Sequence, residues 1–172
     1  MEGKFTHVDA AGRLRMVDVS AKRPTRRRAL ARCVVVTERS LVEITPRRDQ
    51  LNPAHAARVA GVGAAKRTSE LIPLCHSINL NDVDVTIGDV TEGIEVTASV
   101  TATQRTGVEM EALTACAVAA LSLLYSLRAL DPGARIDDLV LLRKEGGKSG
   151  EWGRLVDERD NSSRRNDLPP VE

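Results

Sequence analysis

The chain has 172 residues, a formal net charge of +1 and 2% aromatic residues. This length suits one domain with a substantial core and is too short to predict two. A nearly neutral charge argues against a global field for capturing nucleic acid, and one Phe, one Trp and one Tyr offer no stacking platform for single strands.

The cysteines and the apolar segments predict the compartment. Cys33, Cys75 and Cys116 lie far apart, form no CxxC pair and are odd in number, which favours a reducing cytoplasm over a disulfide framework. The polar N-terminus lacks the basic start and apolar centre of a secretory signal. The longest apolar stretch, 115–127, is shorter than the roughly 20 residues of a membrane span. We expect a soluble, cytoplasmic protein that binds neither a membrane nor nucleic acid.

The first half of the chain predicts one strand and one helix. Residues 1–28 are polar and basic without apolar periodicity, which predicts an extended arm or loop. The β-branched run in 30–37 predicts a strand, whereas 38–44 is ambiguous between helix and strand. Asn52 before Pro53 is typical of a helix start, because Asn caps free amides and Pro suits the first turn. We expect this helix to end near Pro73.

The second half predicts a hairpin, a long helix and a last strand. Alternating apolar residues in 83–87 and 94–100, on either side of the turn 89–93, predict the hairpin. Residues 108–130 predict a helix with acids in its first turn and a Pro/Gly stop. Because this helix is apolar around most of its circumference, we expect a subunit contact. Residues 136–142 predict a strand, and 153–172 a disordered tail.

The order strand, helix, strand, strand, helix, strand is typical of a ferredoxin-like α+β sandwich, with two helices on one face of an antiparallel sheet. We therefore predict a single, oligomeric domain over 29–152, preceded by the arm and followed by the tail.

The segment 145–150, EGGKSG, resembles a phosphate loop without being one. A Walker motif requires glycine where this chain has Leu142. Lys144 and Lys148 flank two glycines that let backbone approach a ligand closely. An anion site and a plain glycine loop both remain open.

His76 follows Cys75 directly within SELIPLCHSINL. Adjacent residues are poorly placed to ligate one metal, so we expect no metal site. A histidine beside an apolar run is either a hydrogen-bonded core residue or a catalyst. Lys66 and Arg67 precede it, where cations complement a helix dipole or serve the same site.

Charged residues flank the long helix and the first strand. Glu109 and Glu111 either complement the helix dipole or contact ligand, if the first turn lies in a cleft. Tyr125 and Arg128 are i, i+3 neighbours on one helix face. The run 26–28, three arginines, is either a solvated basic loop or a phosphate clamp.

Four blocks together resemble the MoaC family, cyclic pyranopterin monophosphate synthase of molybdenum cofactor biosynthesis: HVDAAGRLRMVDVSAK, ARVAGVGAAKRTSELIPLCHSINL, RTGVEMEALTACAVAAL and EGGKSG. The resemblance covers roughly 6–152 and implies a ferredoxin-like subunit in a homohexamer, a trimer of dimers, with its pocket at a subunit interface. The implied reaction converts 3′,8-cyclo-7,8-dihydro-GTP to cyclic pyranopterin monophosphate with loss of pyrophosphate. It implies no metal or organic cofactor.

The resemblance also implies site residues. Catalytic roles are expected for His76, Glu109, Glu111, Tyr125 and Arg128. Substrate contacts are expected for Leu74, Cys75, His76, Met110, Glu111, Lys66, Arg27, Arg105, Lys144 and Lys148.

Three positions depart from the family pattern. Tyr125 stands where the family carries an aspartate, and Arg128 and Gln50 stand where it carries lysines. Arginine stays protonated near neutral pH, and tyrosine, with an ordinary pKa of about 10, is a poor base. Two hypotheses follow: an active synthase, or a non-catalytic or altered-specificity paralog that binds a guanine nucleotide or assembles with an active subunit. A nucleic-acid binder acting through the basic run ranks below both.

Overall fold

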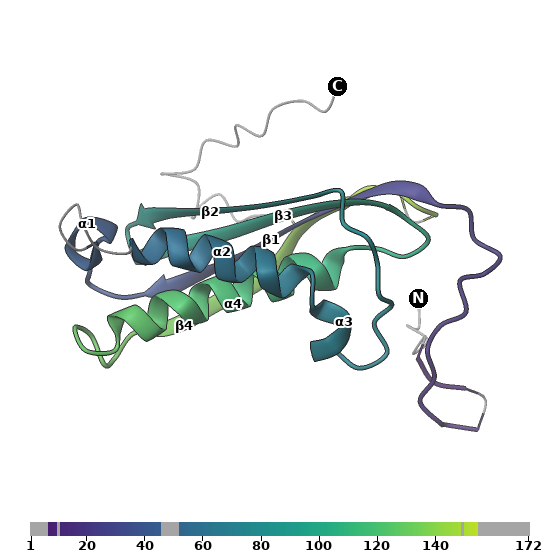
Figure 1. The fold of residues 1–172 in the computed structure, drawn as a ribbon, viewed down its shortest axis with the longest axis horizontal. Helices are drawn as coiled ribbons and strands as arrows, with labels where there is room; N and C mark the ends of the chain where they lie inside the picture. The colour runs from purple at the N-terminus through teal and green to yellow at the C-terminus, as the bar shows by residue number, and fades with distance from the viewer. Residues whose placement is uncertain (1–6, 10, 46–51, 149, 155–172) are drawn as a thin grey trace.

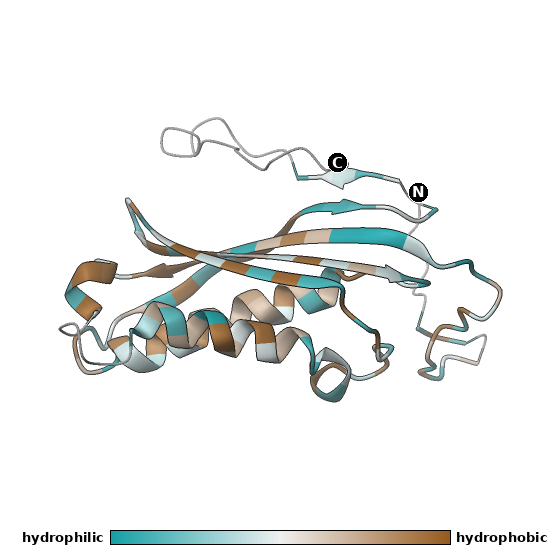
Figure 2. Cartoon of the chain, turned by 45° about the horizontal axis from the view of Figure 1, so that its top comes forward, coloured by the Kyte–Doolittle hydropathy of each residue, from teal (hydrophilic) through white to brown (hydrophobic). Residues whose placement is uncertain are grey.

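The computed structural model describes residues 7–9, 11–45, 52–148 and 150–154. One antiparallel sheet forms a layer, and the two longer helices cover one of its faces (Figure 1). Figure 2 shows the same two layers from the side, with the N-terminal segment beyond one end of the sheet. The predicted α+β class is confirmed.

Strand β1 (Thr25–Val36) lies inside the sheet between β3 (Gly93–Gln104) and β4 (Arg135–Glu145). The outer neighbours are β2 (Asp82–Val90), which pairs with β3, and the short β5 (Trp152–Gly153), which pairs with β4. The order β2-β3-β1-β4-β5 is antiparallel at every pairing. Its four long strands have the split β-α-β arrangement that the element order predicted.

The basic run at 26–28 is strand rather than loop. Thr25 pairs with Gln104 and Arg28 with Thr101, so β3 extends β1 four residues before the predicted boundary at 29. The expectation of a solvated loop at Arg26–Arg28 is therefore wrong. The pattern of residues 26–28 did not predict a strand, because a segment without apolar alternation can still form a strand when it pairs with a neighbouring one. The remaining division into arm, domain and tail stays a prediction, and the tail beyond 154 lies outside the described residues.

The sheet has one apolar and one polar face, as strand alternation requires. Ala29, Ala31, Cys33 and Val35 of β1 belong to the core under the helices. The opposite face carries polar pairs between strands, including the ion pair of Arg32 with Glu95. The helix layer therefore covers the face that needs burial.

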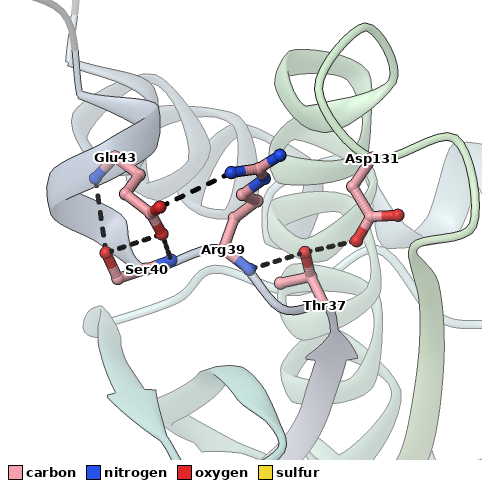
Figure 3. Close-up of polar contacts among 5 residues, drawn as sticks. All are labelled: Thr37, Arg39, Ser40, Glu43 and Asp131. Atoms are coloured by element: carbon pink, nitrogen blue, oxygen red, sulfur yellow. Dashed lines mark hydrogen bonds and ion pairs between the residues drawn. The ribbon is translucent and has the colours of Figure 1, made fainter.

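The segment after β1, which was ambiguous in sequence, forms helix α1 (Leu41–Ile44). A capping box stabilises the N-terminus of this helix (Figure 3). Ser40 Oγ accepts from the Glu43 backbone N–H at 3.4 Å, and the Glu43 carboxylate accepts from the Ser40 N–H at 2.7 Å. These local bonds satisfy amides that a short helix leaves free.

Thr37 joins the end of β1 to the loop after the long helix (Figure 3). Its hydroxyl donates to Asp131 Oδ2 at 2.6 Å and accepts from the Arg39 backbone N–H at 3.2 Å. This bond is the main cause that lowers the pKa of Asp131. It fixes the far end of the molecule, away from the N-terminal segment.

Helix α2 (Pro53–Ala65) begins where the sequence predicted, since Asn52 Oδ1 accepts from the Ala54 N–H at 2.8 Å. It ends at Ala65 rather than near Pro73. A separate short helix, α3 (Thr68–Leu71), follows after Arg67, whose φ of −110° and ψ of 11° interrupt the helical path. The breaker signal of Pro73 was correct, but an earlier backbone break ends the first helix.

Helix α4 (Glu109–Leu127) is the central element of the core. It contacts the sheet on one side and α2, which runs antiparallel to it, on another (Figure 1). By length and composition α4 is the one helix of the described residues that could cross a membrane, but half of that window is buried inside the fold. The buried half of its apolar surface packs into the core of the fold.

The buried cysteines pack β1 against α4. Cys33 and Cys116 are free thiols with their sulfurs 3.3 Å apart. Their mutual hydrogen bond, together with burial, raises the pKa of the Cys116 thiol. A neutral thiol suits this apolar position, because a thiolate would be poorly solvated there.

Two glycines of α2 give a matched test of the packing between the helices. A Cβ at Gly61 would lie 2.9 Å from the Ala115 carbonyl oxygen of α4 and 3.2 Å from Ala119 Cβ, whereas a Cβ at Gly63 meets nothing within 4 Å. We expect Gly63→Ala to stabilise by up to about 1 kcal/mol through helix propensity. We expect Gly61→Ala to be the less stable of the two by about 1–3 kcal/mol, because the helices must separate. Urea unfolding measures both, and equal stabilities would contradict the close contact.

Candidate functional site

A half-open cavity of about 360 Å³ lies at the end of the fold where α4 begins. Three segments far apart in sequence form its walls: the N-terminal segment, the loop after α3 and the first turn of α4. Figure 1 shows the purple N-terminal segment beside the loop that follows α3. The lining residues are His7, Val17, Val19, Lys22, Leu74, Cys75, His76, Thr106, Gly107, Glu109, Met110 and Glu111.

The loop wall is built on a strained turn. Leu74 has φ of +65°, a conformation that costs a branched side chain of order 1–3 kcal/mol. The Cys75 N–H donates to the Ile72 carbonyl at 3.3 Å and closes the turn. Cys75 and His76 are half-buried and line the cavity. Strain held at such a position is typical of functional sites, which weakens the interpretation of His76 as an ordinary core residue.

The first turn of α4 contributes two carboxylates. Glu111 is 4% exposed, whereas Glu109 is half-buried. Burial raises the pKa of the Glu111 carboxyl, and the nearby charge of Glu109 raises it further. A carboxyl with a raised pKa holds its proton closer to neutral pH, so it can act as a general acid.

Cys75 responds to the same surroundings. Burial raises the pKa of its thiol, and the charge of Glu111 adds to the effect. The thiol is therefore held neutral beside the carboxyl. This environment disfavours a thiolate nucleophile and favours a hydrogen-bonding role.

A smaller hollow adjoins the cavity and shares Gly107 and Glu109 with it. Arg27, Arg28 and Lys144 gather here, and Lys144 Nζ lies 3.2 Å from Glu109 Oε1. The Arg27 guanidinium donates to the carbonyls of Gln104 at 3.1 Å and Arg105 at 3.3 Å, which holds it in place. Cations fixed beside a polar cavity can bind phosphate groups.

The glycines of 145–150 are needed for this arrangement. Gly146 and Gly147 have φ of +90° and +72°, and a Cβ on either would collide with Arg26 or Arg27. The segment therefore lets the end of β4 pass close to the start of β1. Its glycines therefore have a packing role. The cations beside them are also suited to binding an anion, so both interpretations of the segment stand.

Several expected site residues lie elsewhere in the single chain. Tyr125 and Arg128 stack at the other end of α4, with the guanidinium carbon 3.8 Å from the ring centre. Along the helix axis Tyr125 lies about 21 Å from Glu111 and Arg128 about 26 Å. Lys66 is the exposed C-cap of α2, and Arg105 and Lys148 are also exposed. None of these five is among the described residues that line the cavity, and Gln50 lies outside the described residues.

Sequence reasoning missed His7, Val17, Val19 and Lys22 as individual site residues. They lie in a segment without secondary-structure periodicity, so no pattern showed which way it turns. Within the described ranges, no group of three or more His, Cys, Asp or Glu side chains is arranged to hold a metal ion. The expectation of no metal or organic cofactor stays a prediction.

The fold and the cavity define a class: a small α+β domain that holds acid–base groups and fixed cations at one end of its sheet. Comparison with known proteins identifies the family. The MoaC family model matches residues 16–147, and the chain belongs to this family.

Curated relatives agree over most of the chain. "Cyclic pyranopterin monophosphate synthase 2" of Mycobacterium tuberculosis is 49% identical, covering 88% of this chain and 92% of the relative. "Cyclic pyranopterin monophosphate synthase" of Streptomyces coelicolor is 45% identical, covering 89% and 91%. The protein of that name from Novosphingobium aromaticivorans is 46% identical, covering 86% and 96%.

The raised pKa of Glu111 predicts a pH-dependent stability. Between the ordinary carboxyl pKa of about 4.3 and the raised value, the folded state binds more protons than the unfolded state. The contribution of Glu111 is therefore full below pH 4.3 and is lost as the pH rises through the raised pKa. We expect the stability difference between wild type and Glu111→Gln, measured by urea unfolding, to shift in favour of the variant with rising pH. A difference independent of pH would contradict the burial effect.

Proposed function

We propose that the chain converts 3′,8-cyclo-7,8-dihydro-GTP to cyclic pyranopterin monophosphate with release of pyrophosphate, in the cytoplasm. The observation that carries this proposal is the convergence of His76 and Glu111 on one cavity beside a cationic hollow. The names of the curated relatives support it and favour an active synthase over a non-catalytic paralog.

The cavity supplies the chemistry that the reaction requires. Opening and reclosing a ring system needs proton transfers, for which His76, Glu109 and Glu111 are placed at the cavity wall. Cys75 and Met110 complete that wall, and the Leu74 turn aims the loop. Departure of pyrophosphate develops negative charge, which Arg27 and Lys144 in the adjoining hollow can stabilise.

We further propose that the working form is a homohexamer whose neighbouring subunits share the site. Within one chain α4 separates Tyr125 and Arg128 from Glu111, so these two can reach a cavity only on another subunit. Tyr125 is 68% exposed and Leu121, four residues earlier, is 55% exposed. Exposed apolar groups on a core helix support a contact with a second copy. In this arrangement Arg128 would hold phosphate and Tyr125 would donate a hydrogen bond.

His76 has a natural control within the same protein. We expect His76→Asn to lower kcat by about 10²–10⁴-fold, the usual contribution of a general acid–base residue. His55, exposed on α2 and outside the cavity lining, should tolerate the same change to Asn. The measurement is pyrophosphate release from purified protein and the cyclic dihydro-GTP substrate. Equal activity of the two variants would remove His76 from the mechanism.

The same assay separates the synthase from the paralog hypothesis. Substrate binding by the wild type without turnover would contradict the proposed reaction. Turnover gained on combining Tyr125→Asp, Arg128→Lys and Gln50→Lys would then show that only the chemistry had been lost.

Shared sites predict complementation between inactive variants. If Arg128 acts on a neighbouring subunit, His76→Asn and Arg128→Gln subunits, each of low activity, should recover activity when unfolded and refolded together. The mixed hexamer would contain some sites with both native residues. Light scattering of the same sample reports the mass. Recovery no greater than the mean of the two parents would contradict a site shared through Arg128.

A further inference from the structure

The N-terminal segment, residues 7–9 and 11–24, forms a cavity wall that lies outside the sheet. Among the described residues, its hydrogen bonds run within the segment. Asp9 accepts from the N–H groups of Ala11 and Arg13, both at 2.9 Å, and Val8 bridges to Leu14. It adjoins the rest of the fold at the cavity itself, where Val17 and Val19 are half-buried. A segment that makes its own hydrogen bonds and lines a cavity is well placed to contact a ligand bound there.

The charges of the cavity show what this segment adds. The first turn of α4 supplies two carboxylates, and the histidines are His7 and His76. Among the described lining residues, Lys22 is the one lysine or arginine. Its N–H donates to the Val19 carbonyl at 3.0 Å, so a turn fixes the point from which its side chain leaves. Lys144 pairs with Glu109 at 3.2 Å from the side of the adjoining hollow, so Lys22 is the cation that the cavity lining itself offers to a polyphosphorylated ligand.

We propose that Lys22 is a substrate-binding residue, and that the N-terminal segment is the wall that makes the cavity selective for a polyphosphorylated ligand. The identity of that ligand rests on the proposed function. Its negative charge is inferred from the residues of the cavity alone. Lys22 lines the same cavity as Glu109 and Glu111, while Arg27 and Lys144 line the adjoining hollow. Phosphate groups can thus be held from two sides, while the buried carboxyl of Glu111 serves proton transfer.

The test compares Lys22→Gln with Arg23→Gln, an exposed neighbour outside the cavity lining. We expect Lys22→Gln to raise KM for 3′,8-cyclo-7,8-dihydro-GTP by about tenfold or more while kcat changes little, because the lost contact is made to bound substrate as well as to the transition state. Lys22→Arg should restore most of the affinity, since it restores the charge. Arg23→Gln should leave both constants unchanged. An unchanged KM in Lys22→Gln, or equal effects of the two Gln variants, would overturn the proposal.

A binding measurement distinguishes failure of this inference from failure of the proposed reaction. Titration calorimetry with inorganic triphosphate needs no turnover. Weaker binding by Lys22→Gln than by Arg23→Gln supports the inference even if the wild type releases no pyrophosphate. Active wild type with equal triphosphate binding by both variants would overturn the inference and leave the reaction standing. Absence of triphosphate binding by the wild type would also overturn it.

Discussion

The close packing of α4 against the sheet and α2 is the constraint on which the site depends. Gly61 lets α2 approach the α4 backbone, and Ala115 and Ala119 keep the facing surface small. Small residues at a helix contact allow a short distance between axes, and a dense interior resists displacement. Because α4 is held along its length, its first turn is a rigid support for Glu109 and Glu111.

That support explains how one end of a small domain acquires unusual acid–base properties. Glu111 belongs to a core helix but lies at its first turn, so it is buried and still reaches a cavity. Burial raises its pKa, and its charge in turn affects Cys75 on a strained loop. Burying an ionisable group costs stability. Groups with strongly shifted pKa values therefore concentrate at functional sites, where the shifted pKa is useful. The opposite end, tied by Thr37 and Asp131, bears Tyr125 and Arg128 on the helix surface.

The fold was largely predictable from local patterns. The hairpin followed from two-residue alternation, α2 from Asn52 and Pro53, and α4 from acids at one end and Pro/Gly at the other. The predictions were wrong where contacts with other segments set the backbone conformation. Thr25–Arg28 became strand because β3 pairs with them, and α2 ended before Pro73 because the backbone breaks at Arg67. Local propensity is a weak guide when pairing across the sheet sets the conformation.

The sequence by itself determined the family, the element order and the residue types around Cys75, His76, Glu109 and Glu111, because these are recorded in contiguous motifs and in periodicity. Only the tertiary structure decided that Glu111 is buried, that Tyr125 and Arg128 lie about 21 and about 26 Å from it along the axis of α4, and that Lys22 lines the same cavity. Burial and proximity between distant segments arise from how the chain packs. A pattern along the chain carries no direct record of them, because it specifies spacing within an element and not the position of one element against another.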